Sequence, residues 1–215
     1  MKIRTLEQFE DALDNELAWR QRELSVLSGQ IASAKGPALE MLLRAGVALL
    51  YAHFEGFVKG ACEAYVEYVS RQKVEYEGLV PGLRALGLRG RLSEATDAKT
   101  MKVWIPFVEF LDETRGKTME LASTGAVRTR SNLTSRVLTE ILMSLGLDSQ
   151  PYELKQNLID KGLVDRRNRI AHGRYLTTPR TDFDDLLGEV RAMIETLRAQ
   201  LSNAAQLSQY RVEVP

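Results

Sequence analysis

Residues 44–69 read RAGVALLYAHFEGFVKGACEAYVEYV, and this stretch decides the fold. Its apolar side chains lie on most faces of a helix, and a helix with that pattern is buried by neighbours on several sides. We therefore expect a long helix over residues 38–70 to be the central helix of a bundle. Lys35-Gly36-Pro37 separates it from the preceding segment, and Pro37 suits a first helical position.

The helical period continues on both sides of this central helix. Residues 5–34 place apolar side chains at three- and four-residue steps, as in an amphipathic helix. Residues 78–98 hold four glycines and a proline, which predicts a loop with one short helical turn at most. A helical segment follows within residues 99–115, where Pro106 either kinks the helix or lies in its first turn. Residues 116–129 are expected to be irregular.

Two further helices are predicted before residue 173. The tetrapeptide SNLT at residues 131–134 offers a helix N-cap, and Gly146 ends the apolar pattern that follows. A helix is then expected over residues 152–172, with an interruption at Lys161-Gly162 left open, and Gly173 stops it.

The final helix is predicted to begin with Thr181 as its N-cap and Asp184 three residues later, similar to a capping box. No segment carries the two-residue period of a strand. The sequence therefore predicts an all-α fold, a single-domain bundle of five to six helices over residues 1–208, followed by a flexible tail at residues 209–215. A chain of 215 residues is ample for one buried core.

The composition is that of a soluble globular protein. Lys and Arg number 29 and Asp and Glu number 29, so any nucleic-acid surface must be a local patch. The lone cysteine, Cys62, suits a reducing cytoplasm. The N-terminus has no apolar signal-peptide core, and the longest wholly apolar run, residues 47–52, is far below the roughly 20 residues that cross a bilayer. We expect a cytoplasmic protein with no membrane partner.

Several kinds of chemistry are not favoured by the sequence. It has no phosphate-binding loop of the Walker type and no dinucleotide-binding glycine motif after a strand. Two histidines far apart in the chain do not predict a His-rich metal site, and no helix shows a Glu-x-x-His spacing. We therefore expect neither a metal nor a cofactor.

The central helix contains two polar residues and three glycines of interest. His53 is expected to be a hydrogen-bonded packing residue, as a lone histidine on an apolar helix commonly is. Glu55 points elsewhere around the helix and is the candidate to face a site on a neighbouring helix. Gly46, Gly56 and Gly60 each lower helix stability by roughly 1 kcal/mol relative to alanine. Close helix–helix approach is the expected compensation, either within the chain or at a dimer interface.

Residues 166–173, RRNRIAHG, are the strongest candidate for a site. The surrounding segment, residues 161–174, has five basic residues and one acid, which makes a local positive patch. One interpretation is a basic helix end that favours the helix dipole and is capped by Gly173. The other is a site that binds phosphate through arginines and moves a proton with His172, whose protonated form the dipole favours.

The spacing within this segment constrains the second interpretation. Arg167 and His172 are five positions apart, about 140° around an α-helix, whereas Asn168 and His172 are four apart and share a face. If Arg167 and His172 act together, the helix must bend or distort, or a second copy must supply part of the site. A histidine that moves a proton and an arginine that stabilises the charged transition state are the parts needed to cleave RNA without a metal.

A second basic group flanks the start of the helix predicted after residue 131. Arg128, Arg130 and Arg136 form either an anion site at the helix N-terminus or a solvated basic turn.

Three stretches resemble one known family, the HEPN domains (higher eukaryotes and prokaryotes nucleotide-binding), in its free-standing bacterial MAE-like branch. They are ALLYAHFEGFVK, TRSNLTSRVLTEILMSLGLD and LIDKGLVDRRNRIAHG, which together span roughly residues 40–175. The HEPN signature is an arginine, four to six residues and a histidine, commonly with a polar residue after the arginine. Here these residues are Arg167, Asn168 and His172. The resemblance implies an α-helical bundle.

The resemblance also implies a function. It predicts a metal-independent endoribonuclease of a toxin–antitoxin module or of anti-phage defence, with a dimer that joins two Arg…His motifs in one cleft. Arg167 and His172 would be catalytic and Asn168 would support them, although Arg166 is also in the allowed range of His172. RNA, a second copy and an antitoxin protein are the expected partners. The arginines expected to bind substrate are Arg166, Arg169, Arg174, Arg128 and Arg130. The alternative is a HEPN module that binds RNA, a nucleotide or a partner protein without cleavage.

Overall fold

The computed structural model describes residues 2–98, 100–119, 121–129 and 131–212. Within these ranges the regular structure is helical, and the only extended pairings are two isolated bridges, Glu75–Thr118 and Leu79–Arg211. The all-α prediction is confirmed. The helices are α1 (Leu6–Ser33), α2 (Gly36–Ser70), η1 (Tyr76–Gly78), α3 (Pro81–Ala98), α4 (Met101–Thr114), α5 (Ser135–Leu145), α6 (Gln150–Glu153), η2 (Leu158–Asp165), α7 (Arg166–Ala171) and α8 (Arg180–Gln206).

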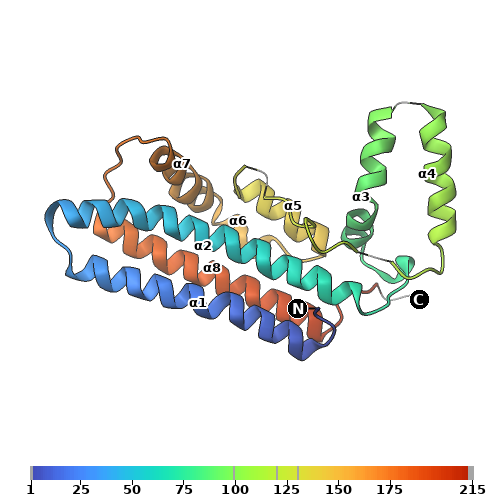
Figure 1. Ribbon diagram of the computed structural model, residues 1–215, viewed down its shortest axis with the longest axis horizontal. Coiled ribbons are helices and arrows are strands. Elements are labelled where there is room, and N and C mark those ends of the chain that lie inside the picture. The colour runs from blue at the N-terminus through green and yellow to red at the C-terminus, as the bar shows by residue number, and fades with distance from the viewer. Residues whose placement is uncertain (1, 99, 120, 130, 213–215) are drawn as a thin grey trace.

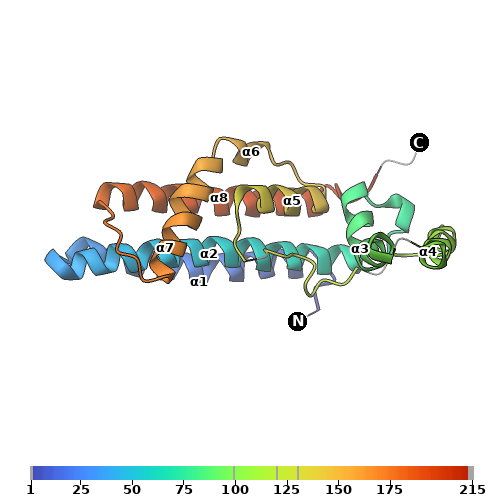
Figure 2. The same cartoon turned by 90° about the horizontal axis from the view of Figure 1, so that it is seen from above.

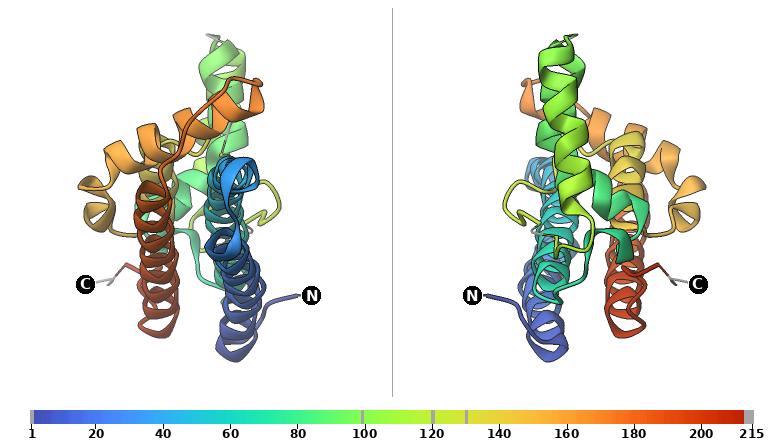
Figure 3. Two further views of the ribbon diagram at one scale, coloured as in Figure 1. Left: turned by 90° about the vertical axis from the view of Figure 1, so that its left-hand side faces the viewer. Right: turned by 90° about the vertical axis from the view of Figure 1, so that its right-hand side faces the viewer.

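Three long helices, α1, α2 and α8, lie side by side and form the body of the molecule (Figure 1). Seen from above, α8 forms one layer and α1 and α2 form the other (Figure 2). The short helices α5 to α7 lie along one side of this body, and α7 packs on α2. At one end, α3 and α4 form a helical hairpin that projects away from the body (Figure 3).

The central position predicted for α2 is confirmed, because both α1 and α8 pack along it. Its side chains Phe54, Phe57 and Tyr65 are fully buried. By length and composition alone, α2 is also apolar enough to cross a membrane, but half of the window that meets this criterion is buried inside the protein. That burial is what a core helix requires.

The glycines of α2 are covered by side chains of the same chain. A methyl group added at Gly46 would lie 2.6 Å from Phe183 Cε2 of α8. One added at Gly60 would lie 2.7 Å from Glu16 Oε2 of α1. Gly56 faces the guanidinium of Arg20 in the same way. The close approach predicted from these glycines is therefore an internal one.

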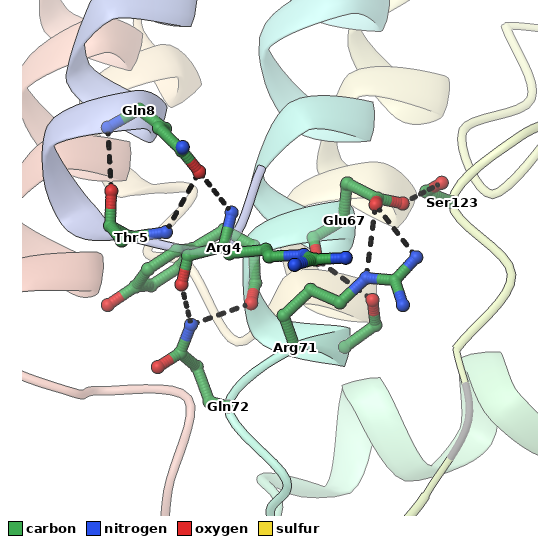
Figure 4. Close-up of polar contacts among 9 residues, drawn as sticks. Arg4, Thr5, Gln8, Glu67, Arg71, Gln72 and Ser123 are labelled. Carbon is green, nitrogen blue, oxygen red and sulfur yellow. Dashed lines mark hydrogen bonds and ion pairs between the residues drawn. The ribbon is translucent and has the colours of Figure 1, made fainter. Parts of the chain in front are cut away.

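Polar contacts join the beginning of α1 to the end of α2 (Figure 4). Thr5 and Gln8 form a reciprocal capping box at the start of α1. Gln72 Nε2 donates to the carbonyl oxygen of Arg4 at 3.2 Å, which ties the N-terminus to the segment after α2. Glu67 accepts hydrogen bonds from Arg71 and from the Ser123 hydroxyl, so the same cluster holds the loop before α5.

The prediction of a loop over residues 78–98 is wrong, because most of this segment forms α3. Pro81 begins the helix, and Leu83 and Leu88 are buried. A methyl group added at Gly82 would lie 2.2 Å from the carbonyl oxygen of Met143 in α5, so this glycine permits backbone contact between two helices. Tertiary packing therefore overrides the low helix propensity of the segment. This extra helix, and the division of residues 150–171 into α6, η2 and α7, account for more helices than the five to six expected.

Helix α4 begins at Met101, five residues before Pro106, so Pro106 lies inside the helix and not in its first turn.

The prediction of Thr181 as an N-cap is wrong. Helix α8 begins at Arg180, and Pro179 occupies the N-cap position without a side-chain hydrogen bond. The fixed φ of proline suits a helix start, which moves the boundary ahead of Thr181.

The described part of the segment expected to be a flexible tail lies on the core. The ring of Tyr210 is buried against Tyr68, with the ring centroids 6.1 Å apart. The amide of Val80 donates to the carbonyl oxygen of Tyr210, and the amide of Val212 donates to that of Gly78. Residues 213–215 lie outside the described residues.

Candidate functional site

Helix α7 carries the RRNRIAHG segment and is continuous with the π-helical η2. The interruption considered at Lys161-Gly162 is therefore a widened helix, not a break. Helix α7 ends as predicted at Gly173, whose φ is +70°. The amide of Arg174 donates to the carbonyl oxygen of Arg169 at 2.9 Å, and that of Gly173 donates to Ile170 at 3.0 Å, which is a Schellman C-cap.

Arg167 lies against the side of α2. Its guanidinium carbon is 4.4 Å from the centroid of the Tyr51 ring, a cation–π distance. Its Nη2 lies 3.8 Å from Glu55 Oε2, and its Nη1 donates to Asn168 Oδ1 at 2.8 Å. The side chains of Arg167 and Glu55 are 27% and 22% exposed, so solvent still reaches the pair. One guanidinium is thus oriented by three neighbours and remains accessible to a ligand.

Tyr51 connects this cluster to the loop before α5. Its ring is buried, and its hydroxyl oxygen accepts a hydrogen bond from the amide of Leu133 at 2.8 Å. Burial raises the pKa of Tyr51 to about 12, and the nearby Glu55 carboxylate acts in the same direction. Tyr51 is therefore a neutral support for Arg167 over the whole physiological pH range.

His172 lies at the C-terminal end of α7, and its side chain is exposed. Its amide donates to the carbonyl oxygen of Asn168 at 3.0 Å, but no side-chain contact joins it to Arg167 among the described residues. Helix α7 is regular from Arg166 to Ala171, so the π-helical distortion ends before Arg167 and does not bring the two side chains onto one face. Within one chain, the arginine faces α2 and the histidine lies at the helix end.

The other arginines of the segment point to different surroundings. Arg166 Nη2 lies 3.2 Å from Asp182 Oδ2 of α8, at the edge of an open cavity of about 910 Å³ between η2 and α8. Arg169 is half-buried and Arg174 is exposed. Each of the two arginines thus has an acidic neighbour, Asp182 for Arg166 and Glu55 for Arg167, and only Arg167 also stacks on a ring of α2.

The chain that follows Gly173 returns to α2. Tyr175 donates its hydroxyl to Glu40 Oε2 at 3.0 Å, and the guanidinium of Arg44 lies 5.3 Å from the centroid of the Tyr175 ring. These contacts hold the segment after His172 over the N-terminal half of α2. Arg44 lies on the same helix as Tyr51, about two turns before it.

Arg128 and Arg136, the described arginines of the basic group near α5, have other contacts than Arg167. Arg128 is exposed and lines a groove between α3 and α5 together with Arg89, and Arg130 lies outside the described residues. Arg136 is paired with Glu140 at 3.2 Å. The predicted substrate arginines therefore do not form one continuous patch in the described part of a single chain.

The N-terminus of α5 is occupied by groups of this chain. Asp160 accepts hydrogen bonds from the amide and hydroxyl of Ser135, each at 2.7 Å, and Thr134 accepts one from the amide of Val137. The N-cap predicted in residues 131–134 is thus confirmed at Thr134. Because the Asp160 carboxylate already binds there, the alternative of a free anion site is not supported.

His53 lies on the other side of α2, against α1. It is buried, its ring packs edge-on to Trp19, and its Nε2 lies 2.9 Å from Glu23 Oε2. The carboxylate is out of line with the ring N–H, so the contact is electrostatic and not a well-formed hydrogen bond. Burial lowers the pKa of His53. His53 is thus a packing residue, whereas Glu55 faces the α7 segment.

Sequence reasoning named Arg167, Asn168 and Glu55 but missed Tyr51. The available signal was the spacing of Tyr51 and Glu55, four positions apart on α2, which places two polar groups on one face of an apolar helix. In the described ranges, no three His, Cys, Asp or Glu side chains converge closely enough to hold a metal ion.

The comparison with protein families identifies the family of this chain. The family model described as MAE_28990-like HEPN matches residues 9–210, so the chain belongs to this HEPN family. Neither the curated proteins nor the solved structures that were compared contain a match. HEPN domains are frequently ribonucleases, commonly bind RNA and commonly form dimers. The signature residues predicted from the sequence lie inside the matched region.

Proposed function

We propose that this protein is a metal-independent endoribonuclease of the toxin–antitoxin or anti-phage defence type, acting in the cytoplasm. One observation carries the proposal. Arg167 is held on Tyr51 beside Glu55 and Asn168, five residues before an exposed histidine at the end of the same helix. An oriented guanidinium and an accessible imidazole are the groups that metal-free RNA cleavage needs.

The proposed reaction is internal transesterification. The ribose 2′-oxygen attacks the adjacent phosphorus and loses its proton, the P–O5′ bond breaks, and the 5′-oxygen gains a proton. The products are a 2′,3′-cyclic phosphate and a 5′-hydroxyl. His172 accepts the proton from the 2′-oxygen and delivers it to the 5′-oxygen. Arg167 binds the phosphoryl oxygens whose charge increases in the transition state.

A second copy completes the proposed site. In one chain Arg167 faces α2 and His172 is exposed at the helix end, with about 140° of helix between their positions. A twofold partner that faces α7 supplies its His172 beside Arg167 of the first chain, and the reverse holds for the second site. This arrangement uses the spacing without any distortion of α7.

Complementation between two inactive variants tests this composite site. Arg167→Ala and His172→Ala should each abolish cleavage. In an equimolar mixture, half of the dimers are mixed and each mixed dimer has one complete site, so about a quarter of wild-type activity should return. Recovery of no activity, with subunit exchange verified by differently tagged chains, would show that Arg167 and His172 do not act across two chains.

The remaining arginines support RNA binding in this proposal. Arg169 and Arg174 extend the positive surface near His172, and Arg166 lies on the adjacent α8 side. Arg128 and Arg130 would contact RNA farther from the cleavage site. Each phosphate contact that is removed should reduce the dependence of binding on salt concentration. An antitoxin protein is the expected natural inhibitor.

A binding function without cleavage is the second candidate. It is favoured by the Glu55 carboxylate, 3.8 Å from Arg167, because this acid already partly neutralises the guanidinium that a phosphate would contact. Salt-sensitive RNA binding without turnover by the wild-type protein would support this function in place of the nuclease.

A further inference from the structure

Helix α4 presents an apolar stripe that, apart from the Trp104 indole nitrogen bonded to α3, the described elements leave open to solvent. Its members follow helical spacing, and they are Met101, Trp104, Ile105 and Val108, which are 60%, 45%, 50% and 56% exposed. Helix α4 packs on α3, through the guanidinium of Arg91 over the Phe110 ring and a bond from Trp104 Nε1 to Ala95 O. Its opposite side faces away from the body (Figure 3). A contiguous exposed stripe of this kind marks an interaction surface.

A groove of about 760 Å³ lies on another side of α3, between α3 and α5. The two helices touch at Gly82, where the backbone of α5 leaves no room for a side chain, and diverge beyond it. The walls of the groove are largely aliphatic, with Leu86 and Leu92 from α3 and Val137, Ile141 and Met143 from α5. Met143 is 64% exposed, so the groove is open to solvent.

Two arginines and one acid line the groove, and the acid, Glu140, is paired with Arg136 at 3.2 Å, which leaves the groove positive. Arg89 and Arg128 both line it, and Arg89 donates to the carbonyl oxygens of Gly125 and Ala126, each at 2.8 Å. Burial, together with the neighbouring charge of Arg128, lowers the pKa of Arg89. Arg128 is exposed and has no acidic partner among the described residues. The groove therefore favours an occupant that is apolar along one side and acidic at one end.

Helix α4 has these two properties. Its N-terminal half carries Lys102, and its C-terminal half carries Glu109 and Glu113, which are exposed and make no ion pair with the described residues. The apolar stripe and this acidic end lie on one helix. The α4 of the same chain is unable to reach the groove because it packs on a different side of α3.

We propose that α4 of a second copy occupies the groove between α3 and α5, and that the exchange is reciprocal. The two hairpins then form a four-helix bundle in which each α4 contacts its own α3 and the partner's α3. An α4 that runs antiparallel to the partner's α3 directs its acidic C-terminal half toward the body, where Arg128 lies. This isologous pairing buries both apolar surfaces at once. It uses a different face from α7, and the partner's α4 and RNA would compete for Arg128.

A charge-exchange experiment tests this pairing by measuring molar mass in solution with light scattering after size exclusion. The variant Arg128→Glu and the double variant Glu109→Lys with Glu113→Lys each place like charges at both contacts. Each should have half the molar mass of the wild-type assembly, whose chain has a mass of 24.2 kDa. In the equimolar mixture every contact of a mixed pair has opposite charges, so the wild-type mass should return.

Matched controls distinguish this effect from a general change in charge or a loss of folding. Glu7→Lys with Asp11→Lys adds the same charge to an exposed side of α1 and should leave the mass unchanged. All variants should retain the helical content of the wild type by circular dichroism. His172→Ala should lose cleavage without any change in mass, which separates this proposal from the nuclease. A monomeric wild type, variants of unchanged mass, or a mixture that does not recover would overturn the pairing.

Discussion

The guanidinium of Arg167 lies 4.4 Å from the centroid of the Tyr51 ring, so the arginine predicted to be catalytic is held by the central helix of the fold. This relationship joins the core to the candidate site. Tyr51 is buried and bonded to the loop before α5, which gives the flexible arginine a rigid surface on one side. An arginine that is ordered before the ligand arrives loses less entropy when it binds.

Two substitutions at Tyr51 should distinguish the role of its ring in cleavage from the role of its hydroxyl in stability. Tyr51→Phe leaves the amide of Leu133 without its acceptor, so the free energy of unfolding should fall by about 1–3 kcal/mol. Cleavage should change little because the ring remains under Arg167. Tyr51→Leu removes the ring, and cleavage should fall by about tenfold, corresponding to about 1–2 kcal/mol of cation–π interaction. Urea unfolding and RNA cleavage rates measure the two effects. Equal loss of cleavage in both variants would show that the ring does not position Arg167.

Glu55 is expected to position Arg167, with little effect on stability. The pair is partly exposed and 3.8 Å long, so Glu55→Gln should change the free energy of unfolding by about 1 kcal/mol or less. The turnover number should change more than the Michaelis constant if Glu55 orients the guanidinium for the transition state. Steady-state cleavage rates over a range of RNA concentrations give both constants. A change in the Michaelis constant alone would indicate a role in RNA binding.

Two glycines of α3 should respond to alanine in opposite directions. Gly82→Ala places a methyl group 2.2 Å from Met143 O, so the protein should lose about 1–3 kcal/mol of stability. Gly90 has nothing within 4 Å, and Gly90→Ala should stabilise the protein by roughly 0.5–1 kcal/mol through helix propensity. Thermal unfolding of both variants is the measurement. Stabilisation by both substitutions would mean that α3 does not contact α5 at Gly82.

Stability should depend on pH through His53. Burial lowers the pKa of His53 in the folded protein, so below about pH 6.5 the unfolded chain binds the proton more readily. The contribution of neutral His53 to the free energy of unfolding is therefore fully present above about pH 6.5. It is lost as the pH falls through the lower pKa that His53 has in the folded protein. Urea unfolding at a series of pH values should show this loss, and His53→Gln should reduce it. An unchanged pH slope in that variant would assign the effect to other groups.

The fold could be predicted from the sequence wherever one helix carries its own pattern. The apolar surface of α2 and the glycine that ends α7 are local features, and both predictions are confirmed. The segment of α3 was different because Gly82 predicts a helix break from the sequence, whereas in the structure it is the point where α3 contacts α5. Its partner, Met143, lies far along the chain, and no local pattern reports that contact.

The candidate site shows the same division. The segment with Arg167, Asn168 and His172 could be recognised because all three residues lie on six consecutive positions. The surroundings of each arginine could not be predicted, because Tyr51 contacts Arg167 from α2 and Asp182 contacts Arg166 from α8. Asp160 likewise occupies the N-terminus of α5 from a distant position, which removes an anion site that the sequence left open.

The central claim is most directly tested by cleavage of RNA in the presence of a chelator, with wild type and His172→Ala compared at equal concentration. The exposed position of His172 predicts that the variant folds with unchanged stability. Wild type should produce fragments with 2′,3′-cyclic phosphate ends, and His172→Ala should produce none. Absence of cleavage by the wild type, or equal cleavage by both proteins, would contradict the assignment of this HEPN protein as a nuclease that acts through His172.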